Sequence, residues 1–316
     1  MNGCPGADEL RALAAGELEG ARADAVLAHA ETCEVCARSL ATAGDGELLL
    51  EVRAALRAET STPAGVRQNR DVGDEVAGYR LLRRIGEGGM GVVFEAEQRH
   101  PRRRVALKLV RRALASERTR RRFEVEAEAL GRLQHPGIAA VHDAGTFDAG
   151  DGPQPYFAME LVRGERLDDW ARLTDDVRAK AEVFAALCDA VHHAHQKGVV
   201  HRDLKPGNVL VDTAARPKVL DFGVARVVDR EVVATELTLA GQLVGTLPYM
   251  SPEQVRGDAD VDATSDVYAL GVVFYELMCG HLPHRLDGLG FATQCRVLTE
   301  QEPEPLGRHD RRLRGD

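Results

Sequence analysis

Residues 201–208 read His-Arg-Asp-Leu-Lys-Pro-Gly-Asn, and residues 221–223 read Asp-Phe-Gly. In order, the two segments supply one base, one cation and two oxygen ligands for magnesium: Asp203, Lys205, Asn208 and Asp221. This set suits transfer of the γ-phosphoryl group of ATP to a hydroxyl group at the mouth of a cleft. Either triplet could occur alone by chance, but their order and separation favour one shared site.

A glycine-rich segment precedes them: residues 85–94 read Ile-Gly-Glu-Gly-Gly-Met-Gly-Val-Val-Phe, which contains G-x-G-x-x-G. In a dinucleotide-binding fold this pattern follows a strand and opens a helix. Here residues 79–85 and 92–97 both favour strands, so we expect a hairpin. Its glycines would let backbone amides approach phosphate oxygens without interference from Cβ atoms.

The next apolar stretch, Val-Ala-Leu-Lys at residues 105–108, predicts a short buried strand. A lone lysine is usually a solvated surface charge. Apolar residues lie on both sides of Lys108 in the sequence, so we expect it to point into the cleft and hold the α- and β-phosphates.

These motifs resemble, in content and order, the eukaryotic-like serine/threonine protein kinases of bacteria, from about Gly78 to the end of the chain. The resemblance implies a helix over residues 117–134 whose Glu126 pairs with Lys108. Glu124 and Glu128 are the alternatives, and at most one of the three can point at the lysine. The implied catalytic residues are Asp203, Lys205, Lys108 and Glu126.

The resemblance also implies a hinge near residues 156–162, with Met159 at the gatekeeper position and the backbone of Glu160 and Val162 bonded to adenine. The implied ATP-binding residues are Gly86, Glu87, Gly88, Gly89, Gly91, Val93, Ala106, Lys108, Met159, Glu160, Val162 and Leu210. A complete set favours an active ATP-dependent enzyme acting on protein Ser/Thr hydroxyls. The alternatives are a nucleotide-binding pseudokinase and a zinc-finger regulatory or scaffold protein.

Lys205, two positions after Asp203, is the family's serine/threonine pattern. Gly207 stands where kinases that favour basic peptides often carry glutamate, so a pocket for substrate arginine is not expected. Arg202 implies activation by phosphate in the following loop, with Thr238 and then Thr235 as the expected acceptors.

The N-terminal segment carries a second pattern, C-x24-H-x3-C-x2-C, formed by Cys4, His29, Cys33 and Cys36. Four nitrogen and sulfur ligands suit tetrahedral zinc, and we favour zinc over a thiol redox switch or the absence of a site. The segment resembles the zinc-binding domain of bacterial anti-sigma factors, which implies a small all-α domain and a protein partner.

The expected architecture is therefore α+β: a bilobal kinase fold preceded by a small all-α zinc-binding domain. The expected units are residues 1–40, a helix and linker at 41–77, and a kinase domain at 78–316, with lobes at 78–159 and 163–316. The net charge of −9 argues against general affinity for nucleic acid.

No apolar stretch approaches the roughly 18 residues of a membrane helix, so a cytoplasmic chain is expected, although a longer natural chain could carry a membrane tether. The helical lobe is expected to be truncated. Glu253 would then lack the arginine it pairs with in the family, and residues 267–277 would be exposed.

Overall fold

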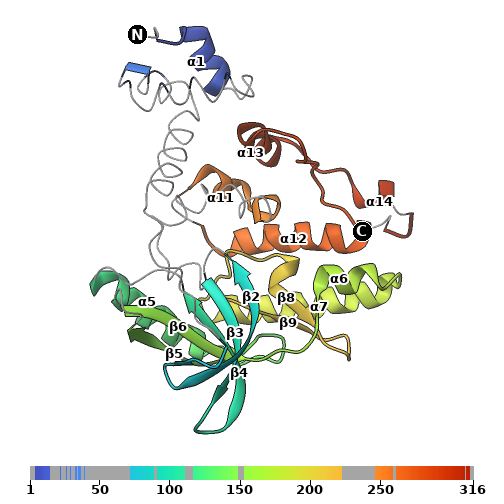
Figure 1. Ribbon diagram of the computed structural model, residues 1–316. Helices are drawn as coiled ribbons and strands as arrows, with labels where there is room; N and C mark the ends of the chain where they lie inside the picture. The colour runs from blue at the N-terminus through green and yellow to red at the C-terminus, as the bar shows by residue number, and fades with distance from the viewer. Residues whose placement is uncertain are drawn as a thin grey trace.

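The computed structural model describes residues 4–14, 22, 26, 29, 33, 35, 36, 39, 72–88, 91–110, 117–148, 153–222, 246–258, 261–309 and 311–313. Within these ranges a sheet-rich lobe and a mostly helical lobe are built from consecutive parts of the chain (Figure 1). The expected kinase-like fold of α and β elements is confirmed.

The first lobe is a six-stranded antiparallel sheet in the order β1-β2-β3-β4-β6-β5. Its strands are β1 Glu75–Val76, β2 Tyr79–Gly88, β3 Gly91–Gln98, β4 Arg103–Val110, β5 Val141–Asp148 and β6 Pro153–Glu160. Helix α5, Glu117–Gly131, packs on this sheet, with the rings of Phe123 and Phe157 5.3 Å apart. The sheet begins at Glu75, before the expected boundary at residue 78, because β1 pairs with β2.

The glycine-rich segment forms the expected hairpin, in which β2 and β3 pair antiparallel with Gly88 opposite Gly91. Gly91 has a structural role that the motif alone did not suggest. A Cβ atom there would lie 2.1 Å from the carbonyl oxygen of Leu109 on β4. The third glycine of the motif therefore allows β3 and β4 to approach. Gly89 lies outside the described residues.

The second lobe contains helices α6 Leu167–Arg172, α7 Val177–Gln196, α11 Pro252–Arg256, α12 Ala263–Cys279, α13 Phe291–Glu300 and α14 Leu306–His309. Short 3-10 turns lie at Pro206–Asn208, Leu247–Tyr249 and Arg311–Leu313. A small sheet, β7-β8-β9, is formed by Glu165–Arg166, Val209–Val211 and Pro217–Val219.

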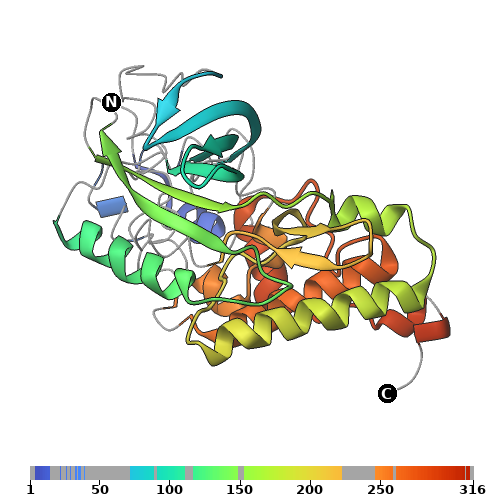
Figure 2. The ribbon, with the colours of Figure 1, turned by 90° about the horizontal axis from the view of Figure 1, so that it is seen from below.

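Helix α7 runs along the helical lobe (Figure 2) and places one apolar face inward. Its buried residues recur at helical spacing: Val183, Leu187, Ala190, Val191 and Ala194. The side chain of Asp176 accepts a hydrogen bond from the amide of Arg178 and caps the helix start. Helix α12 packs beside α7, where the rings of Phe184 and Phe274 are 4.6 Å apart.

One hydrophobic core joins the two lobes beneath the predicted catalytic loop. It extends from Phe123 and Phe157 through Leu187 to Val219 and Val273, all of them buried. Burial of side chains of this size stabilises the fold by roughly 1.5–3 kcal/mol each. The elements that carry the site motifs therefore share one core.

The expectation that residues 267–277 would be exposed is wrong for most of the segment. Val267 is 60% exposed, but the other apolar residues of this stretch of α12 are largely buried. One reason is that α14 packs against α12, where the hydroxyl of Tyr275 lies 2.8 Å from Nε2 of His309. Glu253, expected to lack the arginine that pairs with it in the family, accepts a hydrogen bond of 2.6 Å from Ser265.

The N-terminal segment begins with helix α1, Ala7–Ala14, and residues 22, 26, 29, 35, 36 and 39 are also helical. The predicted helix and linker at 41–71 lie outside the described residues. Among the helices that the structure describes, none combines the length and apolar character needed to cross a membrane.

Replacing Gly91 by Ala should lower the free energy of unfolding by about 2 kcal/mol or more, because the added methyl group overlaps a backbone carbonyl that cannot rotate away. Urea denaturation measures this loss. Gly88→Ala is the matched control, since its methyl group meets no heavy atom of the described chain within 4 Å. Equal stability of the two variants would contradict this role for Gly91.

Candidate active site

The predicted catalytic loop is held by Asp266, a fully buried aspartate of α12. One carboxylate oxygen accepts the amide of His201 at 2.7 Å, and the other accepts the amide of Arg202 at 2.8 Å. His195 of α7 adds a contact of 2.7 Å to the first oxygen. Three elements thus converge on one carboxylate, and Asp266 anchors the loop to α12.

Arg202 adopts a left-handed backbone conformation, with φ of 69°. A side-chain-bearing residue reaches this region at a cost of roughly 1–2 kcal/mol. Asp266 at its amide and Gln254, whose side chain donates to its carbonyl at 2.8 Å, hold the conformation in place. The strain is what turns the chain so that Asp203 follows into the site.

His201 connects the catalytic loop to the segment before Asp221. Its Nδ1 accepts the amide of Asp203 at 3.3 Å, so the ring proton is on Nε2, which donates to the carbonyl of Leu220 at 2.9 Å. The histidine is fully buried, and the edge of its ring meets Phe222. The first residue of the His-Arg-Asp motif is therefore bonded to the residue that precedes the Asp-Phe-Gly motif.

The predicted catalytic residues Asp203 and Lys205 lie together with Asn208. Nζ of Lys205 is 3.0 Å from a carboxylate oxygen of Asp203 and 2.5 Å from the hydroxyl of Thr246. The side-chain amide of Asn208 donates to the carbonyl of Asp203 at 2.6 Å and to its carboxylate at 3.1 Å. The residues are half-buried, as an access point for a substrate hydroxyl requires.

Lys108 is buried in β4 and forms an ion pair of 2.9 Å with Asp221. A buried ammonium group needs a nearby anion, because burial without one costs several kcal/mol. Asp221, like Arg202, has a left-handed backbone, with φ of 57°. On α5, Glu126 is half-buried whereas Glu124 and Glu128 are exposed. The pair of Lys108 with Glu126 stays a prediction.

The donor set of Asn208 and Asp221 fits a magnesium ion. The amide nitrogen of Asn208 is used in its bonds to Asp203, which leaves its carbonyl oxygen to face a cation. The carboxylate of Asp221, which pairs with Lys108, follows Leu220, whose amide donates to the backbone carbonyl of Asn208 at 2.8 Å. Magnesium prefers such hard oxygen ligands and keeps part of its water shell.

The predicted adenine-binding residues come from both lobes. Val93 lies on β3, Ala106 opposite Met159 on β4 and β6, and Leu210 on β8. The amide of Glu160 donates to the carbonyl of Ala140 at 2.8 Å, so only the carbonyl of Glu160 remains for a base. Val162, whose backbone is also expected to bond the base, lies two residues after Glu160.

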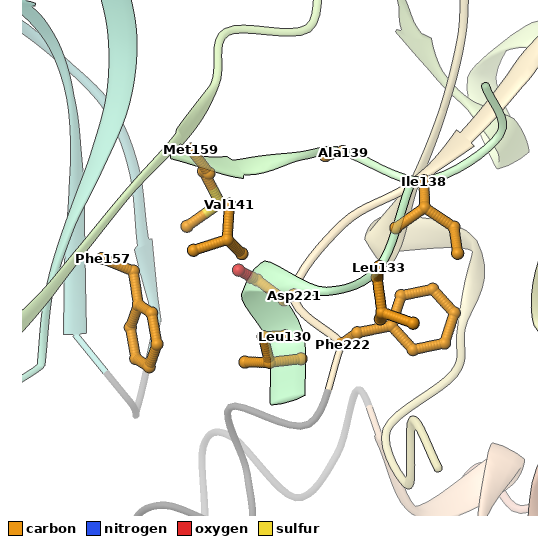
Figure 3. A pocket seen from close by; sticks show the side chains of 9 residues that line it. All are labelled: Leu130, Leu133, Ile138, Ala139, Val141, Phe157, Met159, Asp221 and Phe222. Carbon is orange, nitrogen blue, oxygen red and sulfur yellow. The ribbon is translucent and has the colours of Figure 1, made fainter. Parts of the chain in front are cut away.

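A small apolar cavity of about 10 Å³ lies between α5 and the segment Asp221–Phe222. Figure 3 shows its lining: Leu130, Leu133, Ile138, Ala139, Val141, Phe157, Met159, Asp221 and Phe222. Its one charged residue is Asp221. Met159, expected at the gatekeeper position, is one of the lining residues.

Two pairs at the site were missed by sequence reasoning. His195 of α7 contacts Asp266. Nζ of Lys218 on β9 lies 2.6 and 2.7 Å from the two carboxylate oxygens of Glu160, tying the hinge to the strand that leads to Asp221. The partners are 71 and 58 residues apart, so no local pattern signals them.

The predicted metal ligands of the N-terminal segment also come together. The ligand atoms of Cys4, His29, Cys33 and Cys36 all lie within 4.8 Å of one another, and the sulfurs of Cys4 and Cys33 are 3.8 Å apart. A tetrahedral zinc ion with Zn–S bonds of about 2.3 Å sets its sulfur ligands about 3.8 Å apart. The cluster therefore has the donors and the spacing of a zinc site.

The two C-terminal thiols of this cluster differ. Hydrogen bonds from the backbone of Cys36 and from His29 lower the pKa of Cys33 to about 6. Burial raises the pKa of Cys36 to about 12.

The predicted phosphoacceptors Thr235 and Thr238 lie outside the described residues.

Comparison with known proteins gives a consistent picture. The protein kinase domain profile matches residues 79–300. Serine/threonine-protein kinase pkn3 of Myxococcus xanthus is 45% identical over 243 residues, covering 73% of this chain and 42% of that protein. Serine/threonine-protein kinase PknA of Mycobacterium tuberculosis is 41% identical over 232 residues, covering 72% and 52%. The chain thus spans about half, or less, of the length of these relatives.

A solved structure shares the fold. The crystal structure of the Mycobacterium tuberculosis PknI kinase domain superposes with a TM-score of 0.57 at 30% identity, covering 77% of this chain and 86% of that one.

Replacing Asp266 by Asn should lower the free energy of unfolding by about 3 kcal/mol, because either orientation of the amide turns its NH2 group toward a backbone N–H donor. Thermal or urea unfolding measures it. Asp262→Asn makes the same change at the exposed cap of the same helix, where asparagine caps equally well. Similar losses in both variants would rule out the anchoring role.

Proposed function

This chain belongs to the protein kinase domain family, and from that premise we propose that it transfers the γ-phosphoryl group of ATP to serine and threonine hydroxyls of proteins. The observation that carries the proposal is the convergence of Asp203, Lys205 and Asn208 beside the pair of Lys108 and Asp221. The sequence carries all five residues that this chemistry is expected to use: Lys108, Glu126, Asp203, Asn208 and Asp221.

Each residue has a distinct task in this proposal. Asp203 orients the attacking hydroxyl group and accepts its proton, and Lys205 neutralises negative charge on the transferred group. Lys108 holds the α- and β-phosphates, with Glu126 of α5 as its partner in the nucleotide-bound state. Catalysis of this kind depends on positioning the reactants and stabilising charge. It therefore suits a loop whose backbone, just before Asp203, is bonded to Asp266 of α12.

Asn208 and Asp221 would hold magnesium, which supplies positive charge against the phosphate oxygens. On the adenine side, the carbonyl of Glu160 and the amide of Val162 would bond the base, enclosed by Val93, Ala106, Met159 and Leu210. The glycines of the hairpin, with Glu87 and Gly89, would cover the phosphates. Thr246, bonded to Lys205, borders the place of the acceptor hydroxyl.

A nucleotide-binding pseudokinase is the alternative that a transfer assay separates most directly. The complete catalytic set favours the enzyme. A purely regulatory or scaffold protein would leave the geometry of Asp203, Lys205 and Lys108 without a use.

For the N-terminal segment we propose a zinc-binding domain that docks a protein partner. The donors and spacing of the Cys4, His29, Cys33 and Cys36 cluster support zinc. The substrates are proposed to be proteins, and the cellular site the cytoplasm.

Asp221→Asn should reduce phosphoryl transfer to a protein substrate about 100-fold or more, because the lost charge acts mainly in the transition state. The change also removes the anion beside buried Lys108, so circular dichroism first confirms that the variant is folded. Transfer from radiolabelled ATP at saturating magnesium measures this. Asp212→Asn, at an exposed aspartate paired with Arg216, is the control for loss of a surface carboxylate. Transfer by the Asp221 variant within twofold of the parent would reject the assignment.

One zinc ion per chain is expected by elemental analysis, and Cys36→Ser should release it. Structural zinc contributes folding free energy on the order of 10 kcal/mol, so a chelator should also unfold residues 1–40 without abolishing phosphoryl transfer. Cys188→Ser, at a cysteine of α7 outside the cluster, should retain the metal. A metal-free chain with an intact N-terminal domain would contradict the zinc proposal.

Autophosphorylation should occur at Thr238, or failing that at Thr235. Arg202 lies beside the catalytic aspartate and would bind a phosphate delivered by the following segment. Mass spectrometry of the active protein locates the modified residue. Finding neither threonine modified in an active preparation would refute this form of control.

A further inference from the structure

Arg166 lies over the catalytic loop. It ends β7, opposite Leu210 of β8, and its guanidinium covers Gly207. A Cβ atom on Gly207 would lie only 2.9 Å from Nη2 of Arg166. Glycine at this position therefore provides the space that the guanidinium fills.

The guanidinium of Arg166 is only partly engaged. Its Nε donates to Asp168 at 3.1 Å, whereas Nη1 and Nη2 have no hydrogen-bond partner in the part of the chain that the structure describes. Asp168 is itself shared, because its other carboxylate oxygen is 3.7 Å from Arg172. The Arg166 side chain is 56% exposed. One donor edge is thus open to a ligand.

The position of Arg166 is that of a substrate-binding group. Gly207 follows Asp203 by four residues, and Lys205, between them, is bonded to Thr246. The charges of Arg166 and Asp168 both act on the hydroxyl of half-buried Tyr249, three residues beyond Thr246. Arg166 therefore lies where the catalytic loop meets the segment that borders the acceptor.

We propose that Arg166 determines substrate specificity by binding a carboxylate side chain close to the acceptor serine or threonine. The proposal rests on the transferase function proposed above. A guanidinium binds a carboxylate through two parallel hydrogen bonds, and its free Nη edge has that geometry. Because residue 207 is glycine, no side chain there can occupy the edge in place of a substrate.

The distance along a substrate can be bounded. Four residues of chain separate Gly207 from Asp203, which span at most about 14 Å. An extended peptide advances about 3.3 Å per residue, so the selected acid lies within about four residues of the acceptor. The preferred substrate is an acidic peptide rather than the arginine-containing one that a carboxylate at position 207 would favour.

The test uses synthetic peptides with one central serine in an alanine-glycine background. Each carries a single Asp at one of the four positions on either side, and matched sets carry Lys or phosphoserine. The measured quantity is the ratio of kcat/KM for each charged peptide to that for the neutral parent. We expect an Asp at one or two positions to raise the ratio about tenfold.

The variants separate specificity from structure. Arg166→Ala should remove the Asp preference, and Arg166→Glu should replace it with a Lys preference at the same positions. Arg172→Ala, which also removes a partner of Asp168 but does not lie over Gly207, should keep the parent ratio. A parent ratio near one at every position, or an unchanged ratio in Arg166→Ala, would overturn the proposal. A preference for phosphoserine far above that for Asp would identify a phosphorylated substrate as the source of the anion.

A binding measurement keeps this test independent of catalysis. Fluorescence anisotropy with the same peptides, each with alanine in place of the acceptor serine, reports the Asp-to-neutral ratio of Kd. Absence of transfer to every peptide, with an intact ratio of Kd that depends on Arg166, would refute the proposed catalytic function but not the binding role. Transfer without any Asp preference in kcat/KM or Kd would refute the binding role of Arg166 but not the proposed catalytic function.

Discussion

The geometry of the site depends on one buried carboxylate. Asp266 has no contact with solvent, and its two oxygens accept two consecutive backbone amides of the catalytic loop. An isolated buried carboxylate would be strongly unfavourable, so the helix and the loop can fold only together. Ser265, next to Asp266 in the first turn of the same helix, bonds both Ser251 and Glu253. Helix α12 is therefore the common support of the catalytic loop and of the segment that follows Thr246.

The charged residues of the site are arranged in pairs that leave few net charges unpaired. Lys108 forms an ion pair with Asp221, and Lys205 forms one with Asp203. A bound nucleotide would separate the first pair, and a bound acceptor the second. Each of these pairs offsets the free-energy cost of burying a charge. A bound polyphosphate would exchange one counterion of Lys108 for another. The site is thus prepared to accept negative charge without exposing an unpaired ammonium group.

The sequence predicted those parts of the site that lie within short segments. The order of the motifs predicted the two lobes and the hairpin at Gly88, because each depends on neighbouring residues. The ion pair of Glu160 with Lys218 and the contact of His195 with Asp266 join residues far apart in the chain. Such pairs are decided by the packing of whole elements, which one sequence does not specify. The same holds for the burial of α12, which depends on α14.

Gly207 illustrates how a correct observation can lead to an incomplete conclusion. From sequence, the lack of a carboxylate at this position indicated only that substrate arginine would not be selected. In the structure the space is not neutral, because the guanidinium of Arg166 lies within it and half of that side chain is open to solvent. The sign of the local charge is therefore reversed rather than removed. A missing side chain is informative only together with the group that fills its place. Here that group is Arg166, which lies on a strand far earlier in the chain than Gly207.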